Sequence, residues 1–162
     1  MPDNIMIKSK TPFISIITVT YNSDRYIKQT IKSILNQKFE DFELIISDDA
    51  SEDSTWDLIS EFQDIRIKKN RNKINIGEYH NRNISLQLAT GKYILFIDGD
   101  DYLYPHALLT FNIFESLMPN EAQYFAQAKW DPRIICPVKL SPELIYKFHF
   151  FDKSDRKSTR LN

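Results

Sequence analysis

Two groups of aspartates have the residue types and the spacing that binding of a divalent cation requires. The pair Asp48-Asp49 follows one apolar segment, and the run Asp98-Gly99-Asp100-Asp101 follows another. In an extended chain, residues i and i+2 point to the same side, so the carboxylates of Asp98 and Asp100 can converge on one point. Carboxylates at such a distance repel one another unless a cation lies between them, and oxygen ligands select Mg²⁺ or Mn²⁺. The pattern therefore predicts a divalent-metal site.

A metal at this position would act on a phosphate ester or a diphosphate. A bound divalent ion is a Lewis acid that stabilises the charge of a departing diphosphate, and Gly99 leaves room for a ligand to approach the backbone. Either aspartate group alone is more simply interpreted as solvated loop carboxylates or helix caps. Because both groups follow strands that we expect in adjacent layers of one sheet, the metal-assisted phosphate site is favoured. The aspartates alone do not name a sugar.

The elements that must position these aspartates alternate along the chain. Apolar segments at 14–20, 42–47, 65–67 and 93–97 are expected as strands, each followed by a segment of helical periodicity. This order predicts an α/β fold: a doubly wound, mostly parallel, Rossmann-like sheet with helices on both faces. Ligands of such sheets bind outside the carboxyl ends of the strands, where both aspartate groups lie.

Helix boundaries have their own signals. Ser23 or Asp24 can cap the first helix and Asp53 the second, whereas Gly91 ends the third helix and Pro105 begins the fourth. Apolar residues one turn apart predict the inner faces of the helices. They are Ile27, Ile31, Ile34 and Leu35 in the first helix, and Ile84 and Leu88 in the third.

Composition excludes several classes of protein. Hydrophobic residues make up 42% of the 162 residues, which is typical of a globular domain, and the formal net charge of −1 does not favour nucleic-acid binding. The single cysteine, Cys136, cannot form an internal disulfide. No segment reaches the roughly 20 apolar residues that cross a bilayer, and no secretory signal is visible. We therefore expect a cytoplasmic protein without a transmembrane segment, with peripheral attachment to the inner face of the membrane as an open alternative for a longer protein.

Five segments in the same order and spacing resemble the family 2 glycosyltransferases of GT-A fold. They are residues 16–22, 33–37, 42–51, 77 with 82–83, and 91–101, and the likeness runs from about residue 13 to residue 109. The resemblance implies metal-dependent transfer of a sugar from a nucleotide-diphosphate sugar, UDP-linked, to a saccharide or lipid-linked acceptor, with inversion at the sugar. It implies Mn²⁺ or Mg²⁺ as the cofactor.

The resemblance also implies roles for individual residues. The nucleotide-sugar-binding residues would be Thr20, Tyr21, Asn22, Asp49, Arg82, Asp98 and Asp100, and the metal ligands Asp101 and Asp100. Thr20 and Tyr21 would line the base pocket, and Asp49 would accept a hydrogen bond from the base. Arg82 would lie near the base or the diphosphate. Asp98 and Asp100 form the family's DxD pattern.

One expected residue is missing from the pattern. Members of this family take a general base from a later acidic motif, and no residue after Pro119 matches it, since Asp131 and Glu143 are isolated. We therefore expect the chain to bind a nucleotide diphosphate but to transfer sugar poorly. The expected organisation is a leader at 1–12, a nucleotide-sugar-binding α/β domain at 13–120 and an incomplete acceptor-side region at 121–154. Residues 155–162 resemble a translated sequencing adapter and are expected to be a non-native tail on a truncated protein.

Four other functions were weighed against this one. The closest rival is a non-catalytic module that binds a nucleotide diphosphate. A receiver-type signalling domain also gathers acids around Mg²⁺, but the run at 98–101 is too rich in acids for that class. A phosphate-binding NTPase loop is absent from the sequence, and the three glycines, Gly77, Gly91 and Gly99, cannot form a dinucleotide-binding Gly-x-Gly-x-x-Gly.

Overall fold

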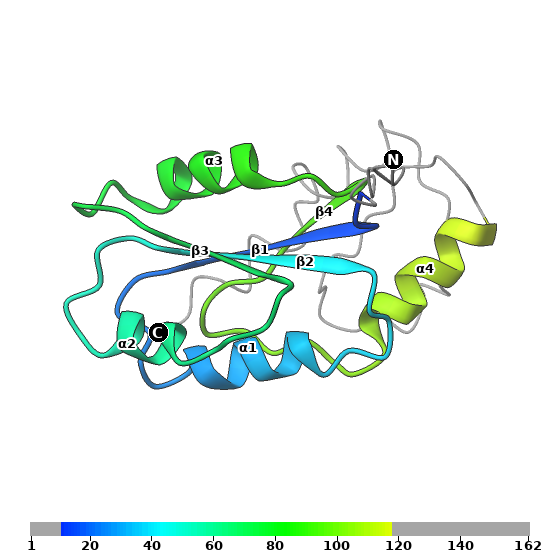
Figure 1. The fold of residues 1–162 in the computed structure, drawn as a ribbon, viewed down its shortest axis with the longest axis horizontal. Coiled ribbons are helices and arrows are strands. Elements are labelled where there is room, and N and C mark those ends of the chain that lie inside the picture. Colours follow the sequence, from blue (N-terminus) through cyan, green and yellow to red (C-terminus); the bar gives the residue numbers. More distant parts are fainter. Residues whose placement is uncertain (1–10, 118–162) are drawn as a thin grey trace, which may run out of the picture. The chain divides into compact units, whose positions relative to one another are not determined.

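The computed structural model describes residues 11–117, which form a four-stranded parallel sheet with helices on both faces (Figure 1). The strands are β1 (Ile14–Thr20), β2 (Phe42–Asp48), β3 (Ile67–Arg71) and β4 (Tyr93–Phe96). The helices are α1 (Ile27–Leu35), α2 (Thr55–Ser60), α3 (Glu78–Leu88) and α4 (Ala107–Leu117). α3 covers one face of the sheet, and α1 and α2 cover the other. The fold predicted from the alternating segments is confirmed. The expected features at 1–10 and 118–162 lie outside the described residues.

The order of the strands is β3-β2-β1-β4, so β1 lies between the two strands that precede the aspartate groups. The expectation that those two strands are adjacent is therefore wrong. β1 pairs in parallel with β2 from Ile14↔Phe42 to Thr20↔Asp48, and with β4 from Ile14↔Tyr93 to Ile17↔Phe96. Because all three strands run the same way, their carboxyl ends still meet at one edge of the sheet.

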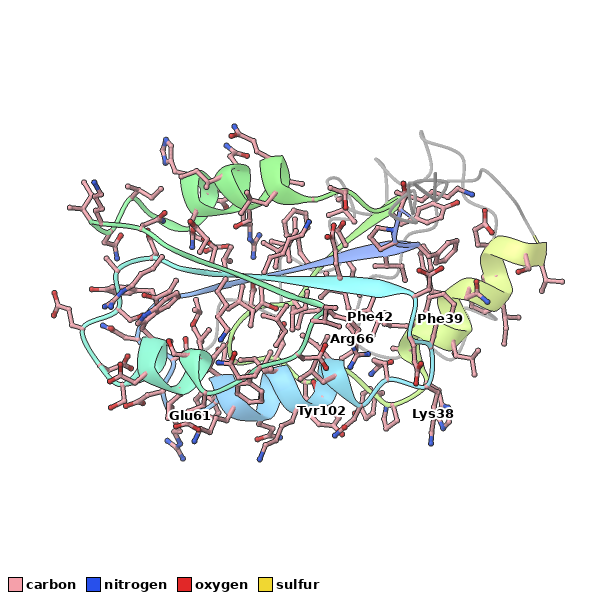
Figure 2. The ribbon with its side chains drawn as sticks, in the orientation of Figure 1. Lys38, Phe39, Phe42, Glu61, Arg66 and Tyr102 are labelled. Atoms are coloured by element: carbon pink, nitrogen blue, oxygen red, sulfur yellow. The ribbon has the colours of Figure 1, made fainter. Side chains whose placement is uncertain are left out.

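β3 begins at Ile67, two residues later than the segment 65–67 predicted. Ile65 is fully exposed, whereas the carbonyl of Arg66 accepts a hydrogen bond from the N–H of Leu44 in β2. The Arg66 guanidinium lies 4.6 Å from the centre of the Phe42 ring (Figure 2). Among the described strands, β3 is hydrogen-bonded only to β2. The backbone hydrogen bonds to β2 therefore set the ends of β3, rather than the apolar pattern from which they were predicted.

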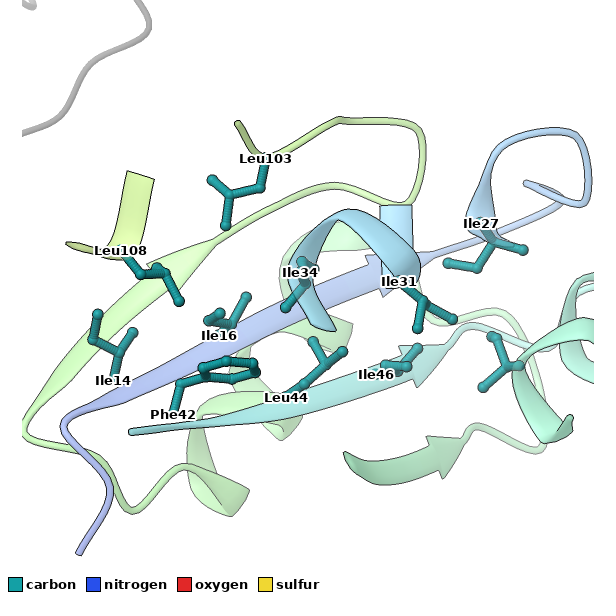
Figure 3. Packing of buried hydrophobic residues seen from close by; sticks show 11 residues of the cluster. Ile14, Ile16, Ile27, Ile31, Ile34, Phe42, Leu44, Ile46, Leu103 and Leu108 are labelled. Carbon is teal, nitrogen blue, oxygen red and sulfur yellow. The ribbon is translucent and has the colours of Figure 1, made fainter. Parts of the chain in front are cut away.

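The main core lies between the sheet and the layer that contains α1 (Figure 3). β1 and β2 are buried along their whole length, as their continuous apolar segments predicted. The predicted stripe of α1 is confirmed, because Ile27, Ile31 and Ile34 are fully buried. Burial of each such side chain contributes about 1.5–3 kcal/mol to folding. Leu108 extends the same core to α4.

The opposite face of the sheet has a much smaller apolar cluster, and the expected inner face of α3 is wrong. The buried residues of α3 are Asn81 and Ser85, whereas the side chains of Ile84 and Leu88 are more than a third exposed. Small polar side chains pack here because they hydrogen-bond to the sheet and to the helix itself, as the Ser85 hydroxyl does to the Asn81 carbonyl. Periodicity of apolar residues cannot reveal an inner face made of polar ones.

Two boundary signals act differently from the prediction. α1 begins without a side-chain cap: the N–H groups of Tyr26 and Ile27 donate to the backbone carbonyl of Ser23. Gly91 does not end α3 through a left-handed turn. Instead its backbone packs against β1 so closely that an added Cβ would lie 2.5 Å from the Ser15 nitrogen. Asp53 acts close to its predicted role: it lies one position before the N-cap residue Ser54, and its carboxylate accepts from the Thr55 N–H at 2.9 Å at the start of α2.

A nearly buried carboxylate, Glu43 on β2, joins three strands to the segment before β4. It accepts hydrogen bonds from the Ser15 hydroxyl at 2.6 Å and the Thr90 N–H at 2.7 Å, and Lys68 lies at 2.6 Å. Burial raises the pKa of Glu43, but the hydrogen bonds from Lys68, Ser15 and Thr90 outweigh burial and hold the pKa below the ordinary value of 4.5. The ionised form is therefore the one that stabilises the fold.

The substitution Glu43→Gln should lower the free energy of unfolding by about 1–3 kcal/mol near neutral pH, because an amide cannot replace a charged acceptor. A carboxyl with a lowered folded pKa stabilises above its unfolded pKa, and the contribution disappears as pH falls through the folded pKa. The difference between wild type and variant in urea unfolding should therefore narrow below pH 4.5. Glu52→Gln, at an exposed position, is the control and should change stability by less than about 0.5 kcal/mol. A difference that stays constant in acid would contradict the prediction.

Candidate functional site

A cleft of about 340 Å³ opens at the carboxyl ends of β1, β2 and β4. Its lining comes from the ends of these strands and from the start of α3: Val19, Thr20, Tyr21, Ser23, Asp49, Asn75, Gly77, Glu78, Asn81, Asp98, Gly99 and Asp100. The prediction that both aspartate groups face one crevice is confirmed. Three other predicted site residues, Asn22, Arg82 and Asp101, are outside this lining.

Asp49 is the member of the first pair that lines the cleft. Its carboxylate accepts hydrogen bonds from the Asn72 side chain at 2.8 Å, the Ile76 N–H at 3.0 Å and the Gly77 N–H at 2.8 Å. Gly77 has φ +87°, a conformation that other residues rarely adopt. The Ile76 N–H also lies 3.2 Å from the second carboxylate oxygen, so both oxygens of Asp49 hold the turn before α3 against the end of β2 at the wall of the cleft.

Asp48, the other member of the pair, is fully buried and serves the fold. Its carboxylate binds the Ser51 hydroxyl and the Ser51 N–H, and it forms an ion pair of 3.2 Å with Arg71. The Arg71 guanidinium also donates to the Ser51 carbonyl. Strand alternation sends two neighbouring aspartates to different environments, and only the second one faces the cleft.

Arg82 lies beside the cleft and bridges two carboxylates that line it. One terminal nitrogen of its guanidinium lies 2.6 Å from Asp98 and 2.9 Å from Glu78. The guanidinium also lies 5.5 Å from the centre of the Phe96 ring, and its Nε atom is buried without a hydrogen-bond partner. A buried donor without a partner is costly. In this structure the terminal nitrogen of Arg82 is paired with both carboxylates, whereas its Nε–H has no partner.

The end of β1 packs directly against the acidic loop. Gly99 is buried, and an added Cβ would lie 2.6 Å from the Thr20 hydroxyl oxygen. That hydroxyl is itself buried without a hydrogen-bond partner. The absence of a side chain at Gly99 thus serves close packing of the loop on β1, in addition to the access for a ligand that the sequence suggested.

The turn after β1 is fastened to the segment before α2. The Asn22 N–H donates to the Ser51 hydroxyl, and the Asn22 side chain accepts from the Glu52 N–H, both at 2.9 Å. The Ser23 N–H donates to Thr55 at 2.7 Å. Asn22 has φ +50° and orients this turn, so the neighbouring Tyr21 is fixed at the rim of the cleft.

Sequence reasoning missed the residues that hold the acidic loop in place. The Thr30 hydroxyl of α1 lies 3.0 Å from the Gly99 carbonyl and 2.7 Å from the Asp101 carbonyl. One turn later the Ser33 hydroxyl accepts from the Leu103 N–H at 3.0 Å. Gln37 continues the row with contacts to the backbone of residues 103, 104 and 108. The spacing of these three polar residues was the available signal of a shared contact. It could not name the partners, which lie about 70 positions away in the sequence.

Asn81 was also missed, and it is the polar centre of the α3 side of the cleft. It is 1% exposed, accepts from the Ser47 hydroxyl at 2.5 Å and donates to the Ser47 carbonyl at 2.9 Å. The Asn72 side-chain amide also donates to the side-chain oxygen of Asn81, at 3.1 Å. This hydrogen-bond network joins α3 to the end of β2 and, through Asn72, supports Asp49.

The cleft combines acceptor side chains with one adjacent cation. Within residues 11–117, no three histidine, cysteine, aspartate or glutamate side chains are placed to hold a metal ion by themselves. Asp98 and Asp100 both line the cleft, whereas Asp101 is exposed at its margin. Two carboxylates of this kind suit a hard divalent ion that takes its remaining ligands from phosphate and water.

Comparisons with known proteins agree with this geometry. The model of the glycosyl transferase family 2 matches residues 15–111. A UDP-Glc:alpha-D-GlcNAc-diphosphoundecaprenol beta-1,3-glucosyltransferase, WfaP of Escherichia coli, is 43% identical over 89 residues, which are 55% of this chain and 36% of that protein. The chain thus spans about a third of the length of such curated relatives.

Two solved structures share the fold. S. aureus TarS in complex with UDP has a TM-score of 0.62 and 31% identity, over 65% of this chain and 32% of that chain. The mannosyltransferase PcManGT from Pyrobaculum calidifontis, in complex with GDP-Man and Mn²⁺, has a TM-score of 0.59 at 24% identity, over 69% and 34% of the two chains. The GT-A fold expected from the sequence is confirmed over the matched residues.

The contact of Thr30 with the acidic loop can be tested with a matched pair of variants. Thr30→Val removes the hydroxyl that binds the Gly99 and Asp101 carbonyls, and should cost about 1–3 kcal/mol in urea unfolding. Thr18→Val makes the same change at a buried threonine whose hydroxyl has no hydrogen-bond partner, so it should cost much less. Hydrogen exchange of residues 99–104 should accelerate only in Thr30→Val. Equal effects of the two variants would contradict the assigned contact.

Proposed function

The chain belongs to the glycosyl transferase family 2, and we propose that its cleft binds the nucleotide diphosphate of a sugar donor, most simply UDP-linked. The full activity proposed is metal-dependent transfer of the sugar to a saccharide or lipid-linked acceptor. The observation that carries the proposal is that Asp49, Asp98 and Asp100 line one cleft together with Thr20 and Tyr21. This brings acceptors for a base, a ribose and a metal ion to the same edge of the sheet.

The base is proposed to lie against Tyr21 and Asp49. Tyr21 is 44% exposed at the end of β1, where its ring offers a surface for stacking. Asp49 is held rigidly by the turn before α3, so its oxygens can accept from an N–H of the base without moving. Asn22 supports this pocket through the backbone of the turn rather than by direct contact.

The diphosphate is proposed to lie between Arg82 and the acidic loop. Arg82 has an unpartnered Nε and a planar fork of donors that suits phosphate oxygens. Asp98 competes with a phosphate for this guanidinium, so binding of a diphosphate would release Asp98 toward the ribose or the metal. This exchange keeps the positive charge paired both before and after binding.

Asp100 and Asp101 are the proposed ligands of Mn²⁺ or Mg²⁺. The ion, when bound, supplies charge stabilisation for the departing diphosphate. Of the two carboxylates, Asp100 is the one that lines the cleft. The backbone carbonyl of Asp101 is fixed by Thr30, so the loop presents its carboxylates from an anchored position. These two carboxylates would hold the ion and would leave its other ligands to phosphate oxygens and water.

The relatives support the donor and the acceptor class. WfaP carries UDP-Glc and a diphosphoundecaprenol-linked acceptor in its name, and TarS was solved with UDP and with UDP-GlcNAc. In the proposed reaction an acceptor hydroxyl attacks the anomeric carbon opposite the diphosphate, which leaves with the bonding electron pair, and the configuration inverts. A base must take the hydroxyl proton, and it stays unassigned among residues 11–117. We propose that this reaction takes place in the cytoplasm.

The second candidate function is non-catalytic binding of a nucleotide diphosphate. The observation that favours it is the same absence of an assigned base among the described residues. Radiolabelled transfer from UDP-Glc or UDP-GlcNAc to a polyprenyl diphosphate sugar separates the two functions. Transfer that Asp100→Asn abolishes supports the enzyme, whereas UDP binding without transfer to any acceptor supports the binding module.

Calorimetric titration of UDP tests the donor site itself. Binding should require Mn²⁺ and should disappear with a chelator. Asp100→Asn should weaken binding roughly tenfold or more, since a hydrogen bond or ligand contact to a charged group contributes about 1.5–3 kcal/mol. Asp101→Asn, compared under the same conditions, shows which carboxylate matters more. Asp57→Asn, an exposed residue of the first turn of α2, should leave binding unchanged. Metal-independent binding, or equal losses in Asp57→Asn, would refute the site.

Arg82 can be assigned to the diphosphate or to the base by a pair of ligands. If Arg82 binds the diphosphate, Arg82→Met should weaken UDP binding roughly 10- to 100-fold and leave uridine binding nearly unchanged. Arg82→Lys should restore only part of the affinity for UDP, because a lysine lacks the planar fork. Equal losses for UDP and uridine would place the guanidinium at the base instead.

A further inference from the structure

A second recess lies along the outer side of α1, away from the sheet. It has a volume of about 370 Å³ and is lined by Arg25, Lys28, Gln29, Lys32, Ser33, Asn36, Tyr102 and Pro105. Figure 2 labels Tyr102 beside α1 and Lys38 in the segment beyond the end of the helix. None of these residues except Ser33, through its contact with the acidic loop, has a part in the proposed donor site.

The charged side chains of this recess are of one sign. They are Arg25, Lys28 and Lys32; together with Lys38, which is exposed just after α1 and outside the recess lining, they are here called the basic α1 surface. The nearest acids are Asp24, beside Arg25, Glu40, two positions after Lys38, and Glu61, which pairs with Lys28 at 2.7 Å.

A chain whose formal net charge is −1 thus carries four basic residues on and beside α1. The acidic residues of the donor cleft lie at the carboxyl ends of the strands instead. A potential of one sign over a patch attracts an anionic partner even when the whole molecule is nearly neutral.

Exposed tyrosines accompany these cations. Tyr26 is 41% exposed and packs under the Arg25 guanidinium at 5.2 Å. Tyr102 and Tyr104 are exposed, with their rings 5.8 Å apart in an edge-to-face arrangement. Basic side chains interleaved with amphipathic rings are the combination found where proteins rest on the headgroup region of a bilayer.

The recess is joined to the donor cleft through a single loop. Residues 98–100 of this loop line the cleft, and Tyr102 and Pro105 line the recess. Thr30 and Ser33 of α1, with Gln37 just after the helix, hold this loop in place. An occupant of the recess thus lies against the segment that presents the acidic residues.

We propose that the basic α1 surface, with Tyr26, Tyr102 and Tyr104, rests on a membrane surface that contains anionic phospholipids. The proposal adds a docking surface to the proposed function, and it rests on that function only for the acceptor: WfaP, a relative, is named for an acceptor linked to diphosphoundecaprenol, a lipid. Docking through this surface would bring the donor site to the plane in which such an acceptor lies.

The shape of the surface favours a bilayer over a soluble anion or a nucleic acid. Arg25 and Lys32 are exposed to solvent, as cations that contact lipid headgroups are, whereas the strong charged hydrogen bonds of a phosphate site need donors of fixed geometry. No helix within residues 11–117 is long and apolar enough to cross a membrane. Contact through headgroups needs neither a buried cation nor a spanning helix.

Sedimentation with vesicles tests the proposal on the 162-residue chain without nucleotide. The probes are vesicles of phosphatidylcholine alone and of phosphatidylcholine with phosphatidylglycerol. Binding should occur only with the anionic lipid and should weaken as salt is raised. Lys32→Glu reverses one charge of the basic α1 surface and should weaken binding about 25-fold, from about fivefold for each unit of charge. Lys73→Glu, an exposed lysine between β3 and α3, makes the same change in net charge and should weaken binding less than about twofold.

The outcomes separate this proposal from the proposed function. Circular dichroism first shows that both variants are folded, and UDP titration reports on the donor site independently. Loss of vesicle binding in Lys32→Glu with unchanged UDP binding supports the docking surface. No binding of the folded wild type to anionic vesicles, or equal losses in the two variants, overturns it. Retention of inorganic phosphate or an oligonucleotide in place of vesicles, sensitive to Lys32→Glu, overturns it as well.

Discussion

Parallel pairing of β1 with β2 on one side and β4 on the other is the constraint on which the rest of the structure depends. The pairing puts the carboxyl ends of β1, β2 and β4 at one edge of the sheet. The segments that follow these strands therefore come together there, although helices separate them in the sequence. β1 is buried along its whole length, which makes its direction and register expensive to change. A slip of one residue would turn Ile14 and Ile16 out of the core and would separate Thr20 from Gly99.

Different sides of α1 contact the core, the loop of the cleft and the solvent. Its isoleucines fill the core, and a row of polar residues at Thr30, Ser33 and Gln37 holds the loop that presents Asp98 and Asp100. The remaining side carries cations to solvent. Because a helix is rigid over this length, the position of the loop is coupled to the packing of the core. That coupling gives the acidic carboxylates a fixed place even though Asp100 is exposed.

The neighbouring acids Asp48 and Asp49 have different roles because they differ in their surroundings. Asp48 is fully buried with Arg71 and Ser51, which satisfy its charge, so it contributes to the fold. Asp49 is held by backbone N–H groups and faces the cleft. The sequence placed both at the end of a strand but could not say which of them faces a ligand, since that depends on the turn before α3 some 27 positions later.

The sequence by itself determined the alternation of strands and helices, the bounds of β1 and the apolar stripe of α1, because these depend on local periodicity and β-branched composition. It also located the aspartates at strand ends. The tertiary structure decided what local patterns do not encode. It inserted β1 between β2 and β4, buried Asn81 instead of Ile84, and gave Gly91 its role in close packing. It also paired Arg82 with Asp98. Each of these outcomes rests on a hydrogen bond, an ion pair or a packing contact between groups brought together only by folding, and their energies depend on that proximity rather than on neighbours in the chain.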